Sequence, residues 1–150
     1  MPDSVVVQVH KKILEKIAVS YAGGYSGLDL TSAVVRGSVT DPPQIPFACV
    51  HFADALEDYG PTMGRFSTNS IFEIYVFAAG GSVAERSDNS LNLVSDCITA
   101  LTADRTLGLA GLIDDIKCSY LSLDGDRYGV EGVGIGYIRC EVQFQTATGA

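Results

Sequence analysis

One stretch decides the fold more than any other: residues 66–79, with the sequence FSTNSIFEIYVFAA. Its apolar side chains recur at alternate positions, which is the period of a β-strand. The set expected to face the core is Phe66, Phe72, Ile74, Val76 and Ala78. The other set is mixed: Ser67, Asn69, Ile71, Glu73, Tyr75 and Phe77. We therefore predict a strand whose second face is also covered by another surface.

A second long strand is predicted at residues 134–146, where Ile138, Cys140, Val142 and Phe144 alternate with Tyr137, Arg139, Glu141, Gln143 and Gln145. Shorter strands are predicted at 33–39, 47–52 and 113–123. Residues 53–64 are acidic and lack apolar periodicity, which indicates an exposed loop or hairpin arm.

Two helices are predicted, at about residues 4–22 and 87–104. The first has an apolar stripe of Val6, Val9, Ile13 and Ile17, and the second has one of Leu91, Val94, Ile98 and Leu101. We expect Ser87 to cap the second helix. The long strands and short turns favour a mainly antiparallel β-sheet with both helices packed on one face. The 150 residues are expected to form a single α+β domain, 1–150.

Composition narrows the class of protein. Apolar residues make up 47% of the chain and charged residues 19%, which excludes a disordered tail. The net charge of −8 and the scattered basic residues argue against a nucleic-acid-binding protein. No apolar run approaches the roughly 18 residues of a membrane span, and the start of the chain has no signal-peptide pattern. We expect a soluble, cytosolic protein without a membrane partner.

The sequence predicts no metal site. The four cysteines, Cys49, Cys97, Cys118 and Cys140, form no CxxC pair, and we expect them to be reduced thiols that pack as small hydrophobic side chains. Cys49 and His51 share a strand face, but two ligands do not make a structural zinc site.

No catalytic or cofactor-binding group is predicted either. The glycines of 132–136 lead into a strand and not into a helix, so they indicate a flexible start or a bulge of that strand and not a dinucleotide loop. The acidic turn at 124–131 departs from the calcium-loop pattern because Tyr128 takes a ligand position. Ser26 lies among glycines but outside a G-x-S-x-G motif. We therefore do not expect an enzyme.

Read together, residues 42–146 show a longer pattern. A Pro-rich lead-in, PPQIPFACVHF, precedes an acidic loop, EDYGPTMGRF, and the strand FSTNSIFEIYVFAAGG. Then come a helix with a polar start, SDNSLNLVSDCITALTADRTLGLAGLI, and the closing strand GIGYIRCEVQFQT. This order resembles the tail terminator (tail completion) proteins of long-tailed bacteriophages. The most telling piece is residues 100–109, ALTADRTLGL, which is similar to that family's helix, aspartate and Thr-Leu-Gly segment.

The resemblance implies a structural protein without catalytic residues or a cofactor. Such proteins form six-membered rings that cap the head-proximal end of the tail tube, stop its polymerisation and offer a surface for head joining. The implied partners are further copies of the chain, the tail tube protein, the head–tail connector or stopper protein and, in a contractile tail, the sheath. Genomic DNA would pass through the lumen without specific binding. The implied location is the neck of the virion tail, after assembly in the host cytoplasm.

Five residues are expected at a subunit or tube interface: Arg65, Glu73, Tyr75, Arg139 and Glu141. Arg139 and Glu141 share a strand face, and either they pair with Glu73 on a neighbouring strand or they point at another subunit. The loop 53–65 and the mixed face of 67–77 are further expected contacts.

Two other functions stay open. One is a head–tail connector or neck protein of related fold. The other, from a different class, is a small-molecule-binding or enzymatic α+β domain with a pocket between sheet and helices.

Overall fold

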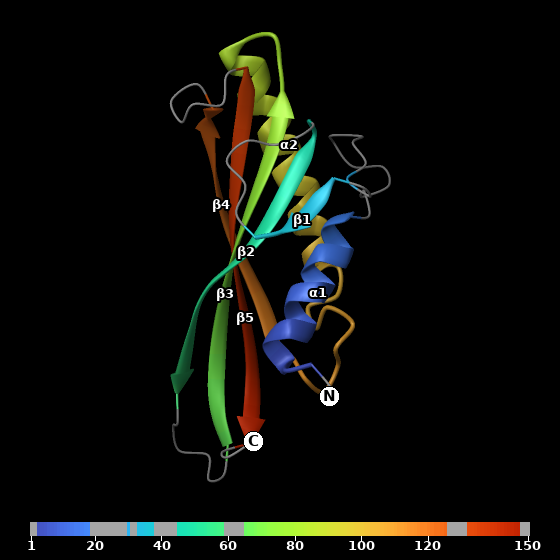
Figure 1. Ribbon diagram of the computed structural model, residues 1–150, viewed down its shortest axis with the longest axis vertical. Coiled ribbons are helices and arrows are strands. Elements are labelled where there is room, and N and C mark those ends of the chain that lie inside the picture. The colour runs from blue at the N-terminus through green and yellow to red at the C-terminus, as the bar shows by residue number, and fades with distance from the viewer. Residues whose placement is uncertain are drawn as a thin grey trace.

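Two helices and five strands make up the described part of the computed structural model, which comprises residues 3–18, 30, 33–37, 45–58, 65–125 and 132–147 (Figure 1). For 56–58, 65–67, 124 and 145–147, only the backbone is described. In chain order the elements are α1 (Val5–Ala18), β1 (Val34–Arg36), β2 (Phe47–Asp58), β3 (Arg65–Ala79), α2 (Val83–Thr102), β4 (Asp115–Asp124) and β5 (Val133–Ala147). The predicted α+β class is confirmed.

The five strands form one sheet in the order β1-β2-β3-β5-β4. Every neighbouring pair is antiparallel except β1 and β2, which are parallel. The two strands with the clearest alternation, β3 and β5, lie side by side and pair along their whole length, from Arg65 opposite Ala147 to Ala79 opposite Val133. On both strands, every even-numbered residue whose side chain is described is buried, which fits this central position.

Both helices pack on the same face of the sheet, as predicted (Figure 1). Even-numbered residues of β3 and β5 point toward them: Phe72, Ile74, Val76 and Ala78 from β3, and Ile138, Cys140, Val142 and Phe144 from β5 are all buried. The predicted core face is therefore confirmed; Phe66 lies outside the residues whose side chains are described. From the helices, the stripes centred on Val9, Ile13, Val94 and Leu101 fill the other side of the core.

The prediction for the ends of α2 was wrong by about one turn at its start. Ser82, and not Ser87, is the N-cap: its Oγ accepts a hydrogen bond from the Glu85 backbone N–H at 3.2 Å. The Glu85 carboxylate accepts one at 3.2 Å from the N–H of Gly81, the residue before the N-cap, which is a variant of the capping box. At the other end α2 stops at Thr102, before the predicted Asp104. For α1, Ser4 precedes the first helical residue, and the predicted extension over 19–22 lies outside the described residues.

The strands differ from the prediction mainly in length. β2 continues to Asp58, so residues 53–58 are strand and not loop, and they form the arm of a hairpin with β3. A register shift between Phe52 and Asp54 marks a bulge there. Residues 53–55 are exposed, as their composition indicated, whereas 59–64 lie outside the described part. β4 begins at Asp115 and not at 113.

The glycines within β5 allow a close approach of α2, whereas the sequence predicted that they form a flexible start or a bulge of the strand. Pairing with β3 runs without a break from Val133, so no bulge occurs there. A Cβ on Gly134 would overlap the Arg86 carbonyl of α2, and one on Gly136 would overlap the Val94 side chain. These two positions need glycine because the helix lies so close to the sheet.

Candidate subunit interface

Four of the five predicted interface residues lie together on the sheet face opposite the helices. Glu73 and Tyr75 come from β3, and Arg139 and Glu141 from β5. All are odd-numbered, and alternation directs them away from the buried, even-numbered set. We call this surface the open face; with its neighbours on β3, β4 and β5 it comprises Ile71, Glu73, Tyr75, Lys117, Ser119, Leu121, Tyr137, Arg139 and Glu141.

The centre of the open face is a carboxylate held between two tyrosines. Tyr75 donates a hydrogen bond from its hydroxyl to Glu73 Oε2 at 2.9 Å, and burial and the same carboxylate raise the pKa of Tyr137. The two tyrosine rings are directly opposite on β3 and β5, with centroids 5.2 Å apart. Partial burial and the Glu73 carboxylate raise the pKa of Tyr75 to about 12. Both rings are thus neutral, fixed groups on a rigid surface.

Charges of both signs surround this centre. Arg139 Nη1 lies 3.5 Å from Glu141 Oε2, and these side chains are 45% and 32% exposed. Lys117 of β4 is directly opposite Glu141. An ion pair this exposed contributes only about 0–1 kcal/mol within one chain. Its charges therefore remain available to a second molecule.

The sequence allowed two partners for Arg139: Glu73 on a neighbouring strand, or another subunit. β3 and β5 are neighbours, and Glu73 is directly opposite Arg139. The ion pair of Arg139, however, is with Glu141 on its own strand, whereas Glu73 accepts a hydrogen bond from Tyr75.

Arg65, the fifth predicted interface residue, does not lie near the other four. It is the first residue of β3, paired with Ala147, and its side chain is outside the described part. Eight residues of strand separate it from Glu73, roughly 26 Å at about 3.3 Å per residue.

The second face of the sheet divides into two parts. Toward the end of β3 it is apolar, and Phe47, Phe77 and Ile135 are buried in the main core. In the middle, Glu73, Tyr75 and Tyr137 are half-buried and Arg139 is exposed. We predicted that another surface covers the mixed face of residues 67–77. This is confirmed for Phe77, which is buried, but not for the polar residues of the same strand.

Strand β4 adds residues that the sequence reasoning missed. Lys117, Ser119 and Leu121 lie opposite Glu141, Arg139 and Tyr137, respectively. The sequence indicates that these three residues share one face of a strand. Only the pairing of β4 with β5 shows which face of the sheet that is.

The segment that carries the family resemblance is a tight turn after α2. Asp104 accepts hydrogen bonds from the Thr106 N–H at 3.0 Å, the Thr106 hydroxyl at 2.7 Å and the Gly108 N–H at 3.1 Å. These bonds, led by the one from the Thr106 hydroxyl, lower the pKa of Asp104. Leu107 has φ 53° with a fully buried side chain, and Gly108 has φ 74°. Each of the four residues thus has a structural role here: Asp104 accepts hydrogen bonds, Thr106 donates them, Leu107 packs in the core and Gly108 takes a positive φ.

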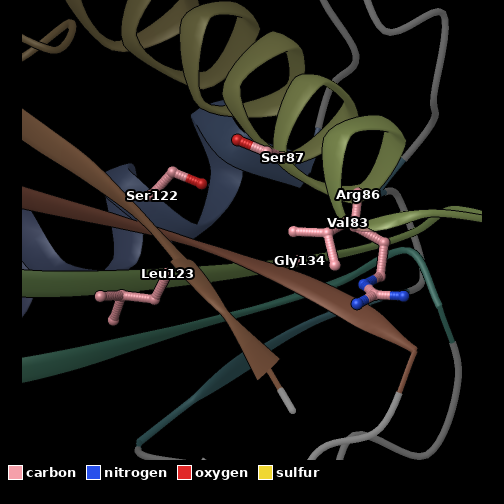
Figure 2. A pocket seen from close by; sticks show the side chains of 6 residues that line it. All are labelled: Val83, Arg86, Ser87, Ser122, Leu123 and Gly134. Atoms are coloured by element: carbon pink, nitrogen blue, oxygen red, sulfur yellow. The ribbon is translucent and has the colours of Figure 1, made fainter. Parts of the chain in front are cut away.

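A small pocket lies between α2 and the sheet (Figure 2). Its volume is about 120 Å³, and it is lined by Val83, Arg86, Ser87, Ser122, Leu123 and Gly134. Pockets for small-molecule ligands usually measure about 300–1,000 Å³. The size of this one does not favour the small-molecule alternative.

Among the described residues, no three or more His, Cys, Asp and Glu side chains group as a metal site would require. Neither helix in that part of the chain has the length and apolar character to cross a membrane.

Comparison of the chain with protein-family models and with curated proteins found no match.

Proposed function

We propose that this chain is a ring-forming tail terminator of a long-tailed bacteriophage, which caps the head-proximal end of the tail tube and stops its growth. The observation that carries the proposal is the open face. Two helices pack against one side of the sheet and bury most of its apolar residues, whereas the middle of the other side presents tyrosines and charges of both signs on paired strands.

The chemistry of the open face suits contact with protein. Tyrosine and arginine are enriched where proteins meet, because they combine contact area with directed hydrogen bonds. Tyr75, Tyr137 and Arg139 lie on two strands that pair over fifteen residues, and each ring is held by Glu73 or by the other ring. Such a surface loses little conformational entropy when it is covered.

The turn at Asp104 gives the segment of the family resemblance a structural role. Its side chains and backbone are bonded to one another between α2 and β4. The resemblance thus concerns a structural element, as expected of a family without catalytic residues.

The acidic charge of the chain has a role in this proposal. Six copies at −8 would carry six times −8, or −48, around the passage for DNA. A negative lumen repels the phosphate backbone and lets the genome slide without binding. A ring structure with a basic lumen would overturn this part of the proposal.

The experiment is to add the purified protein to polymerising tail tubes of the phage that encodes it and to image them by negative-stain electron microscopy. We expect tubes of limited length with a ring at one end. Tubes that grow without limit in its presence would refute the terminator function. A ring that binds the head connector but not the tube would favour the neck-protein alternative instead.

A further inference from the structure

Two cysteines that are 22 residues apart in the sequence are directly opposite each other in the sheet. Cys118 lies on β4 and Cys140 on β5, and the register pairs them. Both belong to the even-numbered set that faces the helices, so their side chains leave the sheet on the same side. Each thiol changes the pKa of the other, so the two sulfurs lie close together.

This placement satisfies the geometry of a disulfide. Directly opposed residues of antiparallel strands have Cα atoms about 4.5–5.5 Å apart. Disulfides usually join Cα atoms about 4.4–6.8 Å apart. The two sulfurs can therefore bond without a shift of either strand.

The two thiols are not equivalent. β4 is the edge strand of the sheet, and Cys118 on it is half-buried, whereas Cys140 on the more central β5 is fully buried. The neighbouring Cys140 thiol and the nearby Arg105 charge lower the pKa of Cys118, and the Cys118 thiol and burial raise that of Cys140. Arg105 is held beside β4 by a hydrogen bond of 2.8 Å from its Nη2 to the Ile116 carbonyl. A reagent from solution thus reaches Cys118 first, and the lowered pKa increases the fraction of Cys118 in the reactive thiolate form.

We propose that Cys118 and Cys140 are a reactive dithiol that closes into a cross-strand disulfide on contact with a small disulfide oxidant. The Cys118 thiolate attacks one sulfur of the oxidant, whose S–S bond breaks and releases one small thiolate. Cys140 then loses its proton to solvent and attacks Cys118 Sγ, which releases the second small thiolate. The cysteine pair loses two electrons, and the oxidant gains them.

The new bond would fasten the edge strand β4 to β5. β4 has a single neighbour in the sheet, so its far backbone edge has no strand beside it among the described residues. The other two cysteines are less accessible: Cys49 is fully buried and Cys97 almost fully, and burial raises the pKa of Cys97 to about 12. This chemistry does not depend on the proposed ring function, so either can fail without the other.

The test uses an aromatic disulfide, 5,5′-dithiobis(2-nitrobenzoate), on the native protein. We expect two coloured thiolates released per chain, no bound adduct, a protein mass lower by two hydrogen atoms, and a peptide map that joins Cys118 to Cys140. A single thiolate with a stable adduct on Cys118, a Cys118-linked dimer, or no reaction at Cys118 would overturn the proposal.

Variants separate the roles of the two thiols. Cys140→Ala should release half as much thiolate and keep the adduct on Cys118, and Cys118→Ser should react slowly or not at all. The matched control, Cys97→Ala, removes another buried thiol and should behave as the native chain. Because the peptide map of the native chain decides the proposal alone, a variant that fails to fold leaves the test intact.

Discussion

His10 shows how a single polar residue is accommodated in the core. Its ring is buried in α1, where Nε2 donates to the Val50 carbonyl at 3.1 Å and Nδ1 accepts from Arg36 Nε at 3.1 Å. The ring also packs against Phe72, with centroids 5.2 Å apart. Since Arg36 needs an acceptor at Nδ1, these contacts require the neutral imidazole. They connect α1 to β1 and β2.

The protein should lose stability as the pH falls below about 6.5. Burial, followed by the charges of Arg36 and His51, lowers the pKa of His10 below 6.5, although the bond to Val50 opposes this. Below pH 6.5 the unfolded chain therefore binds a proton that the folded chain does not, which favours unfolding. Urea unfolding of the native chain and of His10→Gln between about pH 7.5 and 5.5 would measure the difference in slope. The exposed control, Ser119→Ala on β4, should keep the native slope; the same slope for His10→Gln would contradict this prediction.

Gly136 should not tolerate a side chain. A methyl group there would overlap the side chains of Val94 and Val76, so α2 would have to move away from β5. We expect Gly136→Ala to cost about 1–3 kcal/mol of unfolding free energy, the usual cost of overpacking a core. Chemical denaturation would measure it, with the exposed Ser119→Ala as control. An unchanged midpoint would show that the helix can move without cost.

At the level of elements, the start of α2 was predicted at the wrong serine. Both Ser82 and Ser87 precede helix-forming residues, and the sequence segment SVAE at 82–85 also fits a capping box. The prediction relied on an apolar stripe that begins only at Leu91. It therefore missed the first two turns of the helix, whose residues are largely exposed.

Replacement of Ser82 should therefore cost more than replacement of Ser87. Ser82→Ala removes the acceptor for the Glu85 N–H, and we expect a loss of about 1 kcal/mol. Ser87→Ala should change stability by less than about 0.5 kcal/mol, because the bond from Ser90 goes to its backbone carbonyl. Thermal unfolding of both variants gives the comparison. Equal losses would contradict the observed cap.

At the level of the whole molecule, the two faces of the sheet have different roles: one stabilises the fold, and the other is available for contact with a second molecule. The helix-facing side holds most of the buried apolar residues, whereas the open face holds half-exposed tyrosines and ions. Changes on the open face should therefore alter assembly more than folding.

Charge reversal of Arg139 tests this separation. Arg139→Glu removes the pair with Glu141 and places a carboxylate opposite Glu73, which we expect to cost the monomer no more than about 1 kcal/mol. The same change should abolish ring formation, as measured by light scattering, and Arg139→Gln should weaken it.

The matched control is Lys12→Glu on α1, where Lys12 and Glu15 form an exposed pair at 3.3 Å. It should leave assembly unchanged. A large loss of monomer stability in Arg139→Glu, measured below the concentration of assembly, would instead assign Arg139 a role within the chain.

The sequence alone determined the α+β class, the two helices, the long strands and the face of β3 that turns inward. These follow from local periodicity: apolar residues at every second position, or at every third and fourth, can be buried together only in a strand or a helix.

Only the tertiary structure decided that β5 lies between β3 and β4. That order gathers Glu73, Tyr75, Tyr137 and Arg139 on the open face, brings Cys118 opposite Cys140, and requires glycine beneath α2. Which strands pair depends on contacts between residues far apart in the chain, and no local pattern contains them.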